Sequence, residues 1–347
     1  MVKEYMVMIE ELKELTNLDG PSGFENEVRE YIKKKLEKHL EIKVDKIGNV
    51  IAKNESNKQP HVLICAHMDE VGFVIQDITE DGFIKVAPIG GWDERILLGM
   101  PVRILGKRKI IGVFSTLPPH ILKAEEAMKV QRIEDCHIDT GLTKKELLEE
   151  GIDIGTFVTP HSNFIINKNI IITKALDDRV GCALLIEIAE KIKSFDYSIV
   201  LGATVQEEIG SRGAKVLVNQ VDPDFAIILE CTVAADIPGV ESHRQPTALK
   251  KGPALTLIDK TMIADKSLFD KALLVAKEKG IQYQIKKPIY GGTDAGAIHI
   301  AGTGIPSLVI SCPARYIHSA SSLTTIENLE ETKRLVLAIL EEIINKF

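Results

Sequence analysis

The feature that most constrains the fold is an alternation of two kinds of segment in the C-terminal half of the chain. Apolar runs typical of buried strands, such as 198–206, 225–234 and 305–313, alternate with segments whose apolar residues recur at helical spacing. The helices expected at 180–195 and 267–280 must bury those apolar faces against a sheet. The pattern predicts an α/β layered domain with a central mixed sheet and helices on both faces.

The middle of the chain has a different texture. HVLICAH (61–67) is still an apolar run of the kind that is buried on both faces. Beyond it, strand-like runs are short and are broken by glycine and proline, which is typical of a small β-rich domain. We therefore predict one discontinuous layered domain, residues 1–70 and 167–347, with a β-rich domain inserted at 71–166.

Composition and charge exclude several functional classes. Of 347 residues, 45% are apolar and 27% charged, as in ordinary globular proteins, and the net charge of −7 argues against nucleic acid as the main partner. No apolar stretch approaches the length of a transmembrane helix, and the N-terminus, with acids among its apolar residues, does not resemble a signal peptide. Five scattered cysteines without a C-x-x-C pair suit reduced thiols. We expect a cytoplasmic protein without a membrane or nucleic-acid partner.

One pair of adjacent glutamates differs from the others in its surroundings. Six Glu-Glu pairs occur, and five lie in charge-rich, helix-like stretches where a solvated helix face explains them. Glu207 and Glu208 instead follow the buried strand 198–206 and precede a glycine-containing turn. Two charges at the mouth of a buried strand cost free energy unless something pairs with them, and a metal ion would do so.

Other ligand-capable side chains follow the ends of predicted strands. In an open α/β sheet, ligands bind beyond the carboxyl ends of the strands. The candidates at such positions are His67 with Asp69, Asp177 with Asp178 after the run 169–176, Glu207 with Glu208, Glu230, and His318. Mixed imidazole and carboxylate ligands suit zinc, cobalt or manganese. Because the ligands exceed what one tetrahedral zinc needs, we predict a dinuclear site with a bridging carboxylate.

Each candidate also has an explanation without metal. His67 would suit a hydrogen-bonded core histidine, Asp177–Asp178 a helix N-cap, Glu230 an inward-facing charge at a strand end, and His318 a loop histidine. These explanations are independent of one another, whereas one metal site accounts for all four features together. The glycine-rich GGTDAG segment lacks the phosphate-loop pattern. Its Thr293 and Asp294 either cap the short helix that follows or contact a substrate.

These segments together resemble a known enzyme family. AHMDEVG, KALDDRVG, QEEIGSRGA, LECTVAADIPG, GGTDAG and YIHS occur in the order found in the tetrahedral, dinuclear-metal aminopeptidases. Members of that family are called glutamyl, leucyl or deblocking aminopeptidases, and some are called cellulases or endoglucanases. The resemblance spans essentially the whole chain.

The resemblance implies a role for each matched residue. His67, Asp177 and Glu230 would hold one metal ion, and Asp177, Glu208 and His318 would hold the other, so that Asp177 bridges the two. Asp69 would orient His67, and Glu207 would be the general base. The peptide bond after Asp177 is expected to be cis. Glu230 stands where many relatives have aspartate, which should preserve the site but alter its metal preference.

The implied activity is that of a metal-dependent aminopeptidase. A hydroxide bridging two divalent ions, zinc or cobalt, would attack the peptide carbonyl, while Glu207 takes a proton and passes it to the leaving amine. The substrates would be peptides with a free N-terminus. The 71–166 domain would be PDZ-like and would serve assembly, in which dimers build a tetrahedral dodecamer.

Three other functions are compatible with parts of the pattern. A dinuclear deacylase of N-acyl amino acids would use the same chemistry. An endoglucanase would need two carboxylates flanking a sugar without metal, and it usually offers aromatic platforms, whereas this chain has one tryptophan and 5% aromatic residues. A catalytically silent assembly protein would not need the glutamate at position 207.

Overall fold

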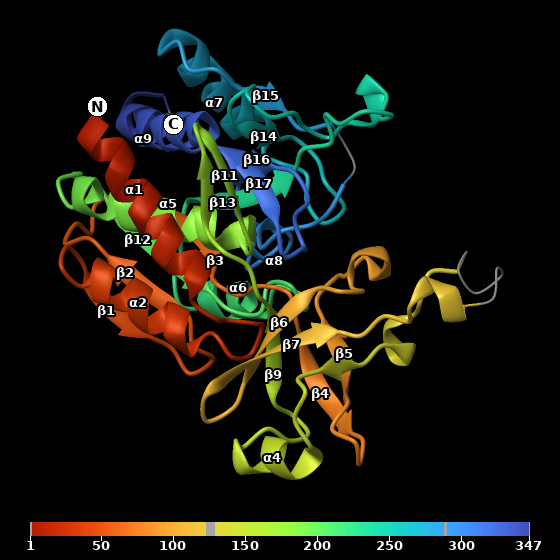
Figure 1. The fold of residues 1–347 in the computed structure, drawn as a ribbon. Coiled ribbons are helices and arrows are strands. Elements are labelled where there is room, and N and C mark those ends of the chain that lie inside the picture. Colours follow the sequence, from red (N-terminus) through yellow and green to blue (C-terminus); the bar gives the residue numbers. More distant parts are fainter. Residues whose placement is uncertain (1, 123–128, 288–289, 347) are drawn as a thin grey trace.

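The central element is a mixed eight-stranded sheet (Figure 1). The computed structural model describes residues 2–122, 129–287 and 290–346. In spatial order the strands are β1 (Glu41–Val44), β2 (Val50–Lys53), β12 (Ile199–Thr204), β3 (Val62–His67), β13 (Phe225–Val233), β16 (Ser307–Ala314), β14 (Ala254–Thr256) and β15 (Gln284–Ile285). β12, β3, β13 and β16 are parallel, and β2 and β14 flank them in antiparallel orientation. Every residue of β3 and β16 is buried, as their apolar runs predict.

Helices pack on the sheet and complete the predicted layers. Helix α5 lies against β3, β12 and β13 and is itself contacted by α1, α2 and α9, while α6 contacts β12 and α8. The helices are α1 (Val2–Asn17), α2 (Asn26–Leu36), α5 (Leu176–Ile192), α6 (Arg212–Leu217), α7 (Lys266–Glu278), α8 (Ala295–Ile298) and α9 (Ile326–Lys346), with the short η4 (Ser242–Arg244). The α/β fold class is confirmed. Among the helices of the described ranges, none has the length and apolar character needed to cross a membrane.

A closed barrel forms the second part of the molecule and lies below the sheet in Figure 1. Its strands, in order around the barrel, are β4 (Gly72–Ile78), β5 (Ile84–Ile89), β8 (Ile138–Asp139), β7 (Lys109–Phe114), β6 (Pro101–Leu105) and β9 (Phe157–Pro160). Helix α4 (Lys144–Glu149) and the short turns η1 (Glu94–Ile96), η2 (Pro119–Ile121) and η3 (Ile133–Asp135) connect them. The barrel has its own apolar core, which includes Phe73 and Phe114 and is separate from the core around the large sheet.

Two segments differ from the expected strands. The run 169–176 does not end in the large sheet, because β11 (Ile170–Thr173) pairs with β10 (Ile165–Asn167) and β17 (Ser322–Thr325) in a separate three-stranded sheet. The run IQYQIKKP (281–288) also has the sequence pattern of a strand, but only β15 within it is paired in the sheet, and Pro288 lies outside the described residues.

A buried cluster of charges ties the barrel to the sheet. Asp19, which is fully buried, accepts from Arg103 of β6 at 2.9 Å and lies 2.8 Å from Lys109 of β7 and 3.3 Å from Lys174. Lys174 also contacts Glu70 at 2.7 Å. Burial alone would raise the pKa of Asp19, but Lys174, Lys109 and Arg103 hold it well below its ordinary value. The two parts of the chain therefore share an ionic junction next to the end of β3.

Candidate metal centre

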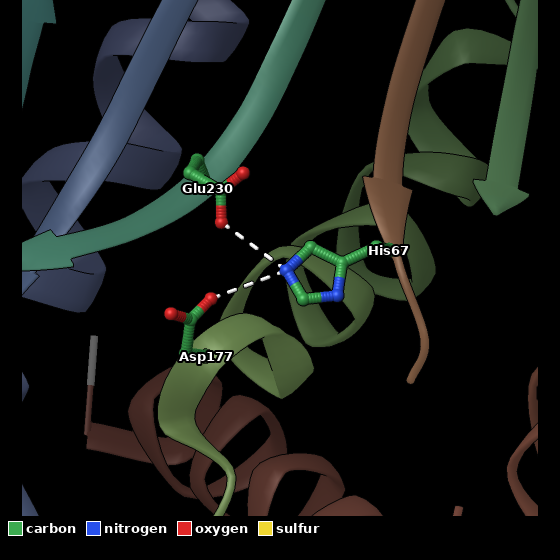
Figure 2. Close-up of side chains that lie close together, drawn as sticks. All are labelled: His67, Asp177 and Glu230. Carbon is green, nitrogen blue, oxygen red and sulfur yellow. Dashed lines mark hydrogen bonds and ion pairs between the residues drawn. The ribbon is translucent and has the colours of Figure 1, made fainter. Parts of the chain in front are cut away.

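Two groups of ligand-capable side chains meet at the carboxyl end of β3. His67, Asp177 and Glu230 form one group, and Asp177, Glu208 and His318 form the other, with the ligand atoms of each group within 4.8 Å of one another. His67 Nε2 lies 3.2 Å from Asp177 Oδ1 and 3.4 Å from Glu230 Oε1 (Figure 2). His318 Nε2 lies 3.3 Å from Asp177 Oδ2 and 3.2 Å from Glu208 Oε1. Each oxygen of Asp177 thus faces a different histidine, which is the arrangement expected of a bridging carboxylate.

His67 and Glu230 lie just beyond the point where strands β3 and β13 stop pairing. The pairing of β3 with β13 ends at Cys65 and Ile228. His67 and Glu230 each lie two residues farther along, so their side chains project from the same face. The strand expected at 225–234 is confirmed by β13, which continues to Val233 alongside β16, and the placement of Glu230 at a strand end was therefore wrong.

Asp177 reaches the site from the non-helical start of helix α5 and not from a strand end. Ala175 has a φ of 53°, Asp177 and Asp178 are non-helical, and the peptide bond between them is cis, as expected. Asp178 Oδ1 accepts from the Gly181 N–H at 2.9 Å. The capping explanation therefore applies to Asp178, and Asp177 is left free to face the two histidines.

Asp69 connects the first histidine to the two glutamates. One of its oxygens accepts from the N–H of Glu207 at 2.9 Å and the other from the N–H of Glu208 at 3.1 Å. The Ser22 hydroxyl donates to it at 2.6 Å, and His67 Nδ1 lies 3.4 Å away. Burial would raise the pKa of Asp69, but these donors lower it. An ionised Asp69 favours the His67 tautomer with a proton on Nδ1, which leaves Nε2 available to a metal.

The barrel positions the second histidine. His318, which has a φ of 57°, places Nδ1 2.9 Å from the carbonyl oxygen of Gly91, in the segment after β5. A proton on Nδ1 donates there and leaves Nε2 facing Asp177 and Glu208. Sequence reasoning missed Gly91, because a backbone carbonyl leaves no signature in the residue type.

Glu207 lies beside the two groups but belongs to neither of them. β12 ends at Thr204, and Gln206, with a φ of 58°, turns the chain just before Glu207. Ser211 Oγ lies 3.4 Å from Glu207 Oε1. Burial, together with the carboxylates of Asp294, Glu230 and Glu208, raises the pKa of Glu207 well above its ordinary value. A carboxylate whose pKa is raised in this way is better suited to hold and pass on a proton than an exposed one.

The donor set fits divalent cations. Burial raises the pKa of Glu230, with a further contribution from Asp177, to about 8. Burial would lower the pKa of His318, yet Asp177 and Glu208 raise it to about 11. The buried carboxylates therefore favour a positive charge at this site. Metal ions supply that charge without protonation of the imidazoles. Two imidazoles and three carboxylates are also the nitrogen and oxygen donors that zinc, cobalt and manganese accept.

Thr293 and Asp294 occupy different environments. Thr293 lines the cavity above the site, and its hydroxyl accepts at 3.2 Å from the N–H of Ala295, the first residue of α8. Asp294 is buried, is not among the residues lining that cavity, and accepts from Thr204 Oγ1 at 2.5 Å.

The cavity over the ligand groups has a volume of about 1190 Å³, room for several residues of a peptide. Its floor includes the ligand residues and Glu207. The barrel segment contributes an apolar wall with Trp92, Leu98 and Met100. Sequence reasoning also missed Lys286, which lines this cavity, because β15 and the strands around it are too short to predict the position of that side chain.

Comparison with known proteins agrees with this geometry. The family model for M42 glutamyl aminopeptidases matches residues 48–335. The glutamyl aminopeptidase of Lactococcus lactis is 33% identical, and the alignment covers 96% of each chain. The lysyl aminopeptidase of Pyrococcus furiosus is also 33% identical, with 97% of this chain and 98% of the relative covered.

Solved structures show the same fold. A TET aminopeptidase from a marine sediment thaumarchaeote superimposes with a TM-score of 0.93 at 37% identity, covering 97% of this chain and 96% of that one. Pyrococcus horikoshii TET1 peptidase, described as assembling into a tetrahedron or an octahedral shell, gives 0.85 at 32% identity, covering 96% and 98%. A Thermotoga maritima protein named endoglucanase gives 0.79 at 35% identity, covering 95% and 96%. With the family model matching most of its length, the chain belongs to the M42 glutamyl aminopeptidase family of peptide hydrolases.

Proposed function

We propose that the protein is a dinuclear metallo-aminopeptidase that removes residues from the free N-terminus of peptides. The observation that carries this proposal is the position of Asp177, whose two oxygens face His67 and His318 at the floor of a large cavity. His67, Asp177 and Glu230 would hold one ion, and Asp177, Glu208 and His318 the other. Zinc or cobalt suits this donor set.

Residues of the chain would transfer the protons and hold the ligands in place. When bound by these residues, two divalent ions would lower the pKa of a coordinated water and polarise the substrate carbonyl. Glu207, which belongs to neither ligand group, takes the proton of the attacking water at its carboxylate and delivers it to the leaving amine. Asp69 holds the backbone of Glu207 and Glu208 and keeps His67 in one tautomer.

We also propose that the chain consists of two domains. We assign residues 1–70 and 167–347 to the catalytic domain and 71–166 to an inserted domain that serves assembly. The barrel supports this division because its apolar core is separate from that of the sheet. P. horikoshii TET1 assembles into closed shells, and we propose that this chain likewise forms a homo-oligomer, with dimers building a tetrahedral dodecamer in the cytoplasm.

A deacylase of N-acyl amino acids is the alternative that the metal chemistry leaves open. A matched pair of tetrapeptides, one with a free N-terminus and one acetylated, separates the two activities on the zinc- or cobalt-loaded enzyme. Release of the first residue from the free peptide alone is expected of the aminopeptidase. Release of acetate from the blocked peptide, with the free one intact, would favour the deacylase.

One similar structure, from T. maritima, is named endoglucanase, but the site of this chain does not favour a sugar substrate. A glycosidase uses two carboxylates that flank the scissile bond. Here Asp177, Glu208 and Glu230 each face a histidine at 3.2–3.4 Å. Their arrangement supports metal binding by these carboxylates, and not direct action of a carboxylate pair on a glycosidic bond.

A further inference from the structure

The loop that carries His318 is closed at its base and strained within. β16 ends at Ala314, and Arg315 pairs with Leu323 of β17 through two backbone hydrogen bonds of 2.8 and 2.9 Å. Between these ends, Tyr316 and His318 both have a left-handed φ, of 59° and 57°. Residues with a Cβ keep that conformation only where their surroundings enforce it. The position of His318 therefore depends on the contacts that hold this loop.

Arg315 fastens the loop to the segment that follows β13. Its Nε donates to Asp236 Oδ1 at 3.0 Å and its Nη2 to Oδ2 at 2.8 Å, so the guanidinium fork engages both carboxylate oxygens. Nη2 also donates to the Asp236 carbonyl at 2.8 Å. Burial would raise the pKa of Asp236, but Arg315 lowers it below its ordinary value. Both side chains are partly buried, and neither is among the described residues that line the cavity.

Hydrogen bonds inside the loop connect this anchor to His318. The Tyr316 carbonyl accepts from the Ser319 hydroxyl at 2.6 Å and from the Ser322 hydroxyl at 3.0 Å. Only two residues separate Arg315 from His318 in the chain. Release of the guanidinium anchor would therefore let the strained loop relax and move the imidazole away from the other ligands.

The ligands His67 and Glu230 are held in a different way. Glu230 lies within the ladder of β13 and β16, opposite Ser311, and that ladder continues to Val233. His67 is the last residue of β3. The large sheet fixes the backbone of these two residues, whereas His318 lies between strands and depends on the contacts of its loop.

We propose that Arg315 and Asp236 are positioning residues that hold His318 in place and thereby set the affinity of the ion site formed by Asp177, Glu208 and His318. The inference rests on the proposed dinuclear centre and adds the pair that keeps one of its two sites in order. We call this site the His318 site and the other the His67 site.

Charge and position predict opposite results for the loss of Arg315. Removing a cation near the His318 site, and leaving the Asp236 carboxylate behind, should favour a divalent ion on electrostatic grounds. Loss of the anchor should instead weaken binding, because the imidazole is no longer held in place. A weaker ion in an Arg315 variant therefore reports the position of His318 and not the charge of the pair.

The test follows the binding of zinc to the stripped enzyme by calorimetric titration, with His318→Ala identifying which binding step belongs to the His318 site. Arg315→Met should raise the Kd of that step about 10-fold, the lower end of the range for groups that orient a metal ligand, because Arg315 acts through the backbone. The Kd of the His67 site should stay within about threefold. Arg334→Met, which removes a surface ion pair with Glu331 on α9, is the matched control and should change neither Kd.

Two further variants test the fork and the pair. Arg315→Lys keeps the charge but loses the fork, so its Kd should lie between those of the wild type and Arg315→Met. Asp236→Asn should weaken the His318 site by a factor similar to that of Arg315→Met. Combining Arg315→Met with Asp236→Asn should add little to either, because both remove the same contact. Should Arg315→Met not fold, Arg315→Lys and Asp236→Asn allow the same comparison of the two sites.

The outcomes separate this inference from the function on which it rests. Unchanged or tighter binding at the His318 site in the Arg315 variants would overturn the role of the pair alone. Equal weakening of both sites, with a lowered melting temperature, would also overturn it, because the pair would then support only the fold. A wild-type enzyme that binds fewer than two ions would overturn the dinuclear centre together with this inference.

Discussion

Glu207 and Glu208 are neighbours in the chain but have different surroundings. Glu208 lies 3.2 Å from His318 Nε2 within the second ligand group, whereas Glu207 stands outside both groups. Asp69 fixes the backbone of both residues by accepting their N–H groups. These different surroundings support the proposal that Glu208 binds metal and Glu207 moves protons.

Replacing Glu207 with glutamine should therefore separate catalysis from metal binding. The amide cannot accept a proton, so kcat should fall by about 10²- to 10⁴-fold. Metal content, measured by elemental analysis, should stay at the wild-type value. Glu10→Gln, at an exposed pair on α1, is the matched control and should leave kcat unchanged. A Glu207→Gln enzyme with near wild-type turnover would contradict the assignment of the base.

Replacing Asp177 with alanine, in contrast, should lower the metal content. Because one oxygen faces His67 and the other faces His318, the substitution removes a ligand from both ion sites. Occupancy should fall below one ion per chain under conditions that load two in the wild type. Asp196→Asn, at a surface ion pair with Lys58, should keep the full content. Two retained ions in Asp177→Ala would exclude its role as a bridge.

The side chains that gather at the proposed metal centre were predictable from the sequence, but the groups that position them were not. His67, Glu208 and His318 stand out together, because one metal site accounts for all of them whereas each explanation without metal covers one feature at a time. The carbonyl of Gly91 and the cation of Lys286 could not be found in this way. Both depend on how the barrel and the far edge of the sheet fold around the site, which residue type alone does not encode.

At the scale of elements, the site depends on where strands stop pairing. β3 and β13 separate after Cys65 and Ile228, and this separation makes room for His67 and Glu230 on one face. The sequence predicted the strands themselves, because their apolar runs have few alternatives. It placed Glu230 at a strand end and Asp177 after a strand of the main sheet, because apolar runs do not show which partner a strand will pair with.

The junction between barrel and sheet should depend on pH through Asp19. Because folding lowers the pKa of Asp19, its contribution is fully present above the unfolded pKa of about 4 and is lost as the pH falls below that value. At pH 7, Asp19→Asn should reduce the free energy of unfolding by about 3 kcal/mol, as expected for a broken buried ion pair. Denaturant unfolding at pH 7 and pH 3 should show the difference between wild type and variant shrinking at the lower pH.

An exposed ion pair provides the control for that experiment. Asp270→Asn removes the partner of Lys266 on the surface of α7 and should change stability by less than about 1 kcal/mol. A loss in Asp19→Asn that is the same at both pH values would show that packing, and not charge, accounts for the effect.

At the scale of the whole molecule, the barrel completes the active-site cavity. Its segment after β5 holds His318 through Gly91 and supplies Trp92, Leu98 and Met100 to the cavity wall. The sequence predicted a β-rich insertion at 71–166 from its short, interrupted strands. It did not predict that the insertion would touch the metal ligands, because that contact depends on how the two cores are joined.

The barrel also presents apolar side chains to solvent, including Ile111, Val113, Leu117 and Ile154, which suit a subunit interface. If twelve chains of 38.3 kDa assemble, light scattering should report a mass of about 460 kDa. A mass near that of one chain at micromolar concentration would contradict the assembly and leave the metal centre unaffected.

Metal-dependent trimming of peptides tests the proposed activity and its metal centre in one experiment. The enzyme is stripped with a chelator, reloaded stepwise with zinc or cobalt, and incubated with a defined peptide mixture that is followed by mass spectrometry. We expect no cleavage without metal, and loss of successive N-terminal residues that reaches its maximum near two ions per chain. Trimming by the fully stripped enzyme, or internal cleavage that ignores the free N-terminus, would contradict a dinuclear metallo-aminopeptidase.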